Sequence, residues 1–149
     1  MSPIKSVQIS CAKIHLHKSG IIELKYNPDH EVELMDAIQV ESVFLEFSKG
    51  KGIYCLMDTK GRMAGYTKEA QNFLAKEASI VKSKQMKCSA VVIDNLPSRM
   101  LTSFFMKLFK PKYKVKTFSN EKDAVIWLES QIALNQKSIH KKDKKHIHN

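Results

Sequence analysis

Two short apolar runs, each ended by an aspartate, constrain the fold of this chain more than any other feature. Residues 53–57 are Ile-Tyr-Cys-Leu-Met before Asp58, and residues 88–93 are Cys-Ser-Ala-Val-Val-Ile before Asp94. Continuous apolar runs of this length are typical of strands that are covered on both faces. Thr67 lies between them as a helix N-cap for residues 69–75. The order strand, helix, strand predicts a parallel α/β unit with the turn after Asp58 at the carboxyl edge of the sheet.

The flanking segments extend this pattern in both directions. Residues 11–17 and 21–26 predict a hairpin, 31–46 a helix, 97–109 a helix, 112–118 a lysine-rich edge strand, and 121–134 a final helix. We therefore expect an α/β fold with a mixed sheet of about five strands and four helices in the order ββαβαβαβα. Because the apolar period stops at Gln136, residues 1–135 are expected to form a single domain and residues 136–149 a disordered Lys/His-rich tail.

Composition and charge limit the kinds of partner. The net charge is +10, but only two of the 25 basic residues are arginines, Arg62 and Arg99. Because base-edge readers and phosphate clamps favour the arginine fork, specific nucleic-acid binding is not expected. No apolar run approaches the roughly 20 residues of a transmembrane helix, and residues 1–5 lack a signal-peptide pattern, so a cytoplasmic location is expected. The three cysteines contain no Cys-x-x-Cys pair and are predicted to be reduced core thiols.

The sequence offers little that predicts catalysis. It contains none of the glycine-rich phosphate loops or nucleophile elbows, so we expect no enzyme activity and no cofactor. His15 and His17 share one face of a predicted strand but lack a third ligand, so no metal site is expected. Asp58 and Asp94 could form a carboxylate pair at one sheet edge, but hydrogen bonding within their turns is the favoured interpretation.

The helix around residues 100–109 carries more apolar residues than one buried stripe needs. Met100, Phe104 and Leu108 make one consistent face, which leaves Phe105, Met106 and Phe109 to be covered by something else. Three interpretations are open: a fully buried core helix, a dimer or partner interface, and a groove for a lipid-like molecule or an acidic membrane surface. Burial combined with self-association, as a homodimer, is favoured because helices that are apolar all round are usually buried.

Several segments resemble the SpoIIAA-like branch of the STAS superfamily, the bacterial anti-sigma-factor antagonists. They are Ala-Val-Val-Ile at 90–93, the helix start at 99–105, Lys-Pro at 110–111, and residues 118–128. The resemblance implies a mixed sheet with helices largely on one side, no cofactor, and action by binding a protein partner. In that family the turn after the third strand carries a phosphorylatable serine between an aspartate and a glycine. Asp58, Thr59 and Gly61 occupy that place here, followed by Thr67.

These observations predict a non-catalytic regulatory or interaction module that binds a protein partner. A phosphate on Thr59 could act as its switch, but the favoured interpretation is that Asp58 only caps the turn. Because the fold family is also similar to CRAL-TRIO lipid-binding domains, a carrier for a small apolar ligand under Met100, Phe104, Phe105, Met106 and Phe109 is the alternative function. An enzyme is the least expected outcome.

Overall fold

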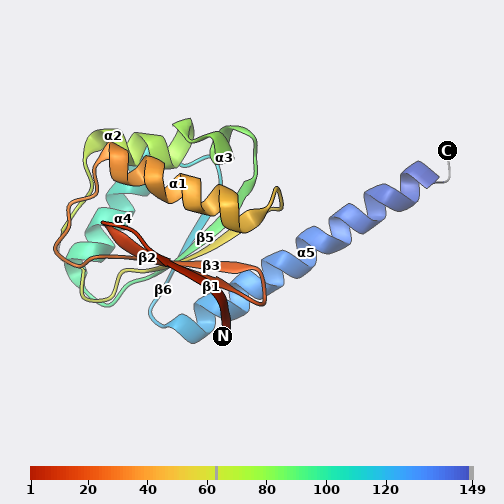
Figure 1. The fold of residues 1–149 in the computed structure, drawn as a ribbon, viewed down its shortest axis with the longest axis horizontal. Coiled ribbons are helices and arrows are strands. Elements are labelled where there is room, and N and C mark those ends of the chain that lie inside the picture. Colours follow the sequence, from red (N-terminus) through yellow and green to blue (C-terminus); the bar gives the residue numbers. More distant parts are fainter. Residues whose placement is uncertain (63, 148–149) are drawn as a thin grey trace.

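The computed structural model describes residues 1–62 and 64–147, without the side chains of Phe104 and residues 143–147, and contains one mixed sheet (Figure 1). The strand order is β1-β2-β3-β4-β5-β6. β1 (Pro3–Gln8), β2 (Ala12–His17) and β3 (Ile21–Tyr26) are antiparallel neighbours. β3, β4 (Ile53–Asp58), β5 (Met86–Val92) and β6 (Lys114–Phe118) run parallel. The predicted α/β fold is confirmed, and β6 is an edge strand as expected.

The sheet has one strand more than the sequence predicted. β1 pairs with β2 at the edge of the sheet, and among its six residues only Val7 is even partly buried. An edge strand that is exposed along its length carries no apolar alternation, so periodicity could not reveal it.

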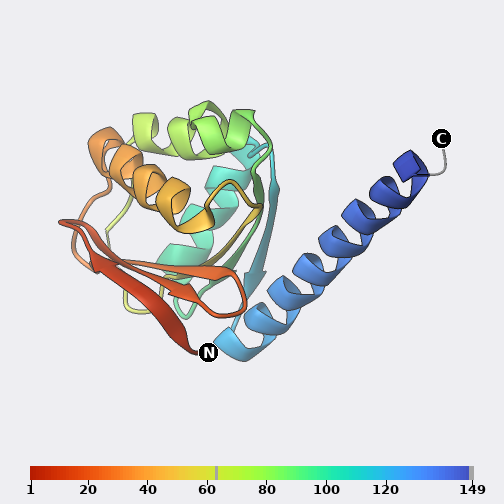
Figure 2. The same cartoon turned by 45° about the vertical axis from the view of Figure 1, so that its right-hand side comes forward.

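Helices cover both faces of the sheet. α1 (Leu34–Ser48), α2 (Lys68–Asn72), the π-helical turn η1 (Phe73–Glu77), α3 (Ser79–Lys82) and α4 (Leu96–Phe109) lie on one face, and α5 (Glu121–Ile147) lies on the other (Figures 1 and 2). Two core clusters reflect this division. One includes Leu24, Phe44 and Cys55, and the other includes Leu56 and Leu128. Helices largely on one side are what the SpoIIAA-like resemblance implied.

α5 is much longer than expected. Ala124 and Leu128 bury its first turns against the sheet, and the helix then projects away from the body (Figure 2). Residues 136–147 are therefore helical rather than a disordered tail, whereas 148–149 lie outside the described residues. No glycine or proline follows Pro111, and Lys, Gln, Ala and Glu favour helices, which explains why the segment continues beyond its apolar stripe.

The three cysteines are free and buried, as predicted. Burial raises the pKa of Cys11 and Cys88 to about 11 and that of Cys55 to about 12, so all three stay protonated near neutral pH. In the described part of the chain, no helix is both long and apolar enough to cross a bilayer.

Candidate functional site

The turn after β4 is held by its own hydrogen bonds. Asp58 Oδ1 accepts from the backbone N–H of Lys60 at 2.9 Å, and the N–H of Arg62 donates to the carbonyl of Thr59 at 3.0 Å. Gly61, third in the turn from Thr59, has φ of +75°, which only glycine adopts without strain. This loop, residues 58–62, is called the β4 turn below.

Thr59 points inward from the β4 turn. Its backbone N–H and its hydroxyl both donate to the carbonyl of Val92, at 3.1 and 2.5 Å. The residue is only 6% exposed. A hydroxyl in this position is not presented to a kinase, so the β4 turn would have to open before Thr59 could accept a phosphate.

The two aspartates at the sheet edge serve the same turn. Asp94 Oδ1 accepts from the N–H of Gly61 at 3.4 Å and from Asn95 Nδ2 at 3.0 Å. Asp58 Oδ2 lies 3.7 Å from Lys25 Nζ. Both carboxylates thus bind backbone amides of the β4 turn, in line with the turn-capping interpretation. Among the side chains that the structure describes, no group of three or more from His, Cys, Asp and Glu could hold a metal ion.

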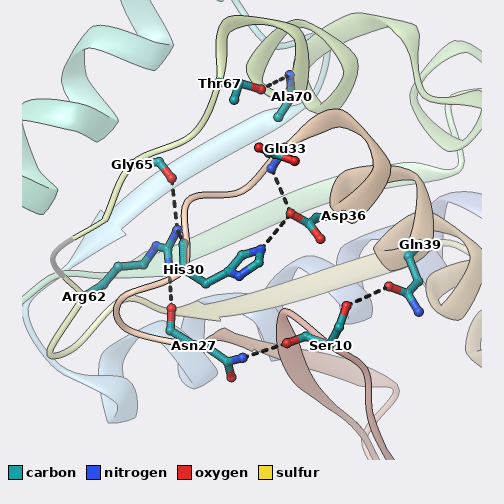
Figure 3. Close-up of polar contacts among 10 residues, drawn as sticks. All are labelled: Ser10, Asn27, His30, Glu33, Asp36, Gln39, Arg62, Gly65, Thr67 and Ala70. Atoms are coloured by element: carbon teal, nitrogen blue, oxygen red, sulfur yellow. Dashed lines mark hydrogen bonds and ion pairs between the residues drawn. The ribbon is translucent and has the colours of Figure 1, made fainter.

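Arg62 is the residue of this region whose role the sequence did not reveal. It is 4% exposed, and its guanidinium donates to the carbonyls of Asn27 at 2.6 Å, His30 at 2.8 Å and Gly65 at 3.1 Å (Figure 3). The sequence offered one signal that Arg62 has a special role. It is one of only two arginines among 25 basic residues, and it lies in the turn after the central strand β4. Arg62 ties the loop before α1 to the loop before α2.

Two tyrosine rings surround this guanidinium. Its central carbon lies 5.2 Å from the ring centre of Tyr26 and 5.0 Å from that of Tyr66, and the two rings meet edge to face. Such cation–π contacts stabilise a buried positive charge. Close by, the Thr67 side chain accepts from the N–H of Ala70 at 3.2 Å, which confirms Thr67 as the N-cap of α2.

The start of α4 is joined to the β4 turn. Asn95 caps α4 by accepting from the N–H of Ser98 at 2.8 Å. The Ser98 hydroxyl donates to the carbonyl of Arg62 at 3.4 Å, and Asn95 Nδ2 does so at 3.5 Å. The structure therefore places the β4 turn, with Asp58, Thr59 and Gly61, beside α4. This is the helix that carries more apolar residues than one buried stripe needs.

The inward face of α4 differs from the predicted one. Ser98, Leu101, Thr102 and Phe105 face the body and Phe109 is buried, whereas Met100 is 63%, Leu108 52% and Met106 38% exposed. The expected stripe of Met100, Phe104 and Leu108 is wrong for its first and last members, and the Phe104 side chain lies outside the described residues. The apolar pattern could not reveal the inward face, because two of its members, Ser98 and Thr102, are polar. Their hydroxyls donate to backbone carbonyls, so they can lie inside.

A cavity of about 100 Å³ lies beneath α4. Its wall is formed by the sheet, α1, η1 and the inward face of α4, and most of its residues are apolar, including Leu24, Phe44, Phe73, Leu74, Leu101 and Phe105. The side chains of Arg62 and Gln71 are in the same wall. Tyr113 closes part of it by donating its hydroxyl to the carbonyl of Leu74 at 3.0 Å, and burial raises the pKa of Tyr113 well above its ordinary value.

A solved structure shares this fold. It is the crystal structure of an uncharacterised protein of the DUF3478 family with a SpoIIAA-like fold, from Shewanella loihica PV-4. The similarity has a TM-score of 0.56 at 17% sequence identity and covers 83% of this chain and 98% of that one. The fold of the present chain is thus SpoIIAA-like.

Comparison with curated proteins gives no match to the chain. A family model described as a domain of unknown function, DUF7793, matches residues 14–132. This range runs from β2 to the middle of α5 and includes the β4 turn, α4 and the whole wall of the cavity. The chain belongs to the DUF7793 family.

Proposed function

We propose that this protein is a non-catalytic binding module, and that the cavity beneath α4 is its site for a small apolar molecule. The observation that carries the proposal is the cavity itself. Ser98, Leu101, Thr102 and Phe105 recur at helical spacing, so one complete face of α4 is directed at it. A helix of the core would instead fill this space with its side chains, because protein interiors are close-packed.

The volume limits the size of the ligand. An apolar cavity of about 150 Å³ binds benzene, so a space of about 100 Å³ suits a small ring or a short aliphatic chain. A complete lipid tail requires outward movement of α4. The backbone is extended at Asn95, before α4, and left-handed at Lys110, after it. Changes in the backbone angles of these two residues would allow the helix to move outward.

The π-helical turn in the wall supports a binding role. The N–H of Ala78 donates to the carbonyl of Phe73 at 2.9 Å, which closes the wide turn of η1. Phe73 and Leu74 of this turn line the cavity. Single π-helical turns are rare and occur frequently at functional sites.

The test is saturation-transfer NMR with benzene as the probe. We expect transfer from the protein to benzene in the wild type and its loss in Thr102→Leu, which fills the space below α4. Ser103→Leu is the matched control, because it makes the same kind of change on the exposed side of the helix. No transfer in any variant, or equal transfer in all of them, contradicts the proposal.

A protein partner at the outer surface of α4 is the second candidate function. Leu96 and Met100 are 64% and 63% exposed, and they flank the contact between α4 and the β4 turn. Exposed apolar side chains grouped beside a structured turn are common in protein interfaces. The SpoIIAA-like fold supports this candidate, and a second copy of the chain is one form that the partner can take. Because the Thr59 hydroxyl is buried, phosphorylation is not included in it.

Light scattering and partner capture test the second candidate. The double variant Leu96→Ser, Met100→Ser is expected to reduce self-association or to abolish capture of a native partner. Leu134→Ser, on the exposed part of α5, is the control. Association that is unchanged in the double variant rules out this surface.

A further inference from the structure

The positive charge of Arg62 has no anionic counterpart among the residues that the structure describes. Among the described residues, Glu23 lies beside His17, Asp58 beside Lys25 and Asp36 beside His30, and no described carboxylate lies within ion-pair distance of Arg62. Three carbonyl groups and two aromatic rings contact the guanidinium instead. A buried charge is costly unless it is paired, and an arginine that is only 4% exposed therefore favours a nearby negative group.

Arg62 and Gln71 each have one buried polar atom with unused hydrogen-bonding capacity. Arg62 Nε is buried and has no acceptor among the described residues, and Gln71 Oε1 is buried and has no donor among them. Gln71 is 7% exposed. Buried polar atoms in native proteins are rarely left without a partner.

Both residues belong to the wall of the cavity. Arg62 and Gln71 both contact Tyr66: Gln71 Nε2 donates to the Tyr66 carbonyl at 3.1 Å, and the guanidinium lies over the Tyr66 ring. The wall of the cavity thus combines a mostly apolar lining with two polar residues, each of which has one buried polar atom without a partner among the described residues. A small ligand site usually has this character, with a few polar groups that orient a mostly apolar molecule.

We infer that the cavity selects a small apolar carboxylic acid, whose carboxyl group lies against Arg62 and Gln71. This inference rests on the proposed function as a ligand-binding module. A carboxyl oxygen accepts from Arg62 Nε, and a charge-assisted bond of this kind is stronger than a neutral one. When the acid is protonated, its hydroxyl donates to Gln71 Oε1. A carboxamide has the same donor and acceptor but lacks the charge that Arg62 favours.

The two arginines of the chain make the test direct. The chain contains only Arg62 and Arg99, so its arginine Nε–H groups give two resonances in a ¹⁵N spectrum. Titrations use benzene, benzamide and benzoate, which share one ring and differ only in the polar group. We expect benzoate to shift the Arg62 resonance, benzene to leave it nearly unchanged, and exposed Arg99 to respond to neither.

Affinities give a second readout. Benzoate is expected to bind at least about tenfold more tightly than benzene, because one hydrogen bond to a charged group contributes about that much to affinity. Arg62→Lys, which keeps the charge and removes Nε–H, is expected to abolish this preference. If it fails to fold, the wild-type resonance shift alone decides.

Three results would overturn the inference. Benzene and benzoate of equal affinity, or benzamide tighter than benzoate, remove the acid selectivity while leaving a ligand-binding cavity. An Arg62 resonance that benzoate binding does not move removes Arg62 as the recognition group. Failure of all three probes to bind contradicts the proposed function itself.

Discussion

The hydroxyl of Thr59 donates to the carbonyl of Val92 at 2.5 Å and ties the β4 turn to the end of β5. Thr59→Val removes this buried bond and keeps the shape, so a loss of about 1 kcal/mol in the free energy of unfolding is expected. Thr59→Glu introduces a buried charge and should be more destabilising. Chemical denaturation measures both.

Lys60→Glu is the control for this pair, because Lys60 is exposed on the same turn. If Thr59→Glu is no more destabilising than Lys60→Glu, Thr59 is accessible and the phosphate switch expected from the STAS resemblance regains support.

Gly61 and Gly65 make a matched pair of glycines near the site. Gly61 has φ of +75°, whereas Gly65 has no positive φ and an added Cβ there meets no atom within 4 Å. Gly61→Ala is therefore expected to lower the free energy of unfolding by about 1 kcal/mol, and Gly65→Ala to leave it unchanged or raise it slightly. Equal effects in thermal denaturation would mean that the backbone of the β4 turn differs from the one described.

Much of this fold could be predicted from local patterns. β4 and β5 are continuous apolar runs that are buried, and Thr67 caps the helix between them. In these segments the tertiary structure agrees with the local preference of each residue, so local patterns were enough to predict them. β1 could not be predicted because its residues are held by pairing with β2 and are barely buried. The helical continuation of α5 was missed because disorder was inferred from charge, although Lys and Gln also favour helices.

The buried stripe of α4 can be checked by truncating one residue on each side. Phe109 is 7% exposed and Met100 is 63% exposed. Phe109→Ala should destabilise the protein by about 3 kcal/mol through lost burial and a new cavity, and Met100→Ala by less than about 0.5 kcal/mol. Equilibrium unfolding in urea distinguishes these values. A larger effect at Met100 than at Phe109 would restore the stripe predicted from the sequence.

The start of α1 gives the protein a pH-dependent contribution to stability. Burial raises the pKa of Asp36, but hydrogen bonds from the Glu33 N–H and from His30, at 2.9 and 2.8 Å, outweigh it and hold this pKa below its ordinary value. A lowered pKa stabilises the folded state above the unfolded value of about 4, and this stabilisation is lost as the pH falls through the folded-state pKa.

Asp36→Asn is expected to cost about 1 kcal/mol at pH 7 and to show little difference from the wild type at the acid end of the range. Unfolding at a series of pH values measures this, with Asp29→Asn as an exposed control. A difference between wild type and Asp36→Asn that does not shrink as the pH falls would show that the Asp36 carboxylate is not stabilised in the folded state.

The polar end of the cavity could not be predicted because its members come from separate parts of the fold. Arg62 follows β4, Gln71 lies in α2, and the carbonyls that hold Arg62 belong to the loop before α1 and to the loop before α2. No spacing in the sequence places these groups together. The candidates that the sequence did supply, Asp58, Thr59 and Gly61, follow from local turn chemistry, which is readable without tertiary contacts.

The most direct test of the central claim, an apolar cavity beneath α4, is a crystal of the protein pressurised with xenon. Xenon enters dry apolar cavities and is located by its scattering. The account predicts a xenon atom between α4 and the sheet, in contact with Leu101 and Phe105. A crystal in which α4 packs directly onto β5 and β6, with no space and no xenon between them, would contradict it.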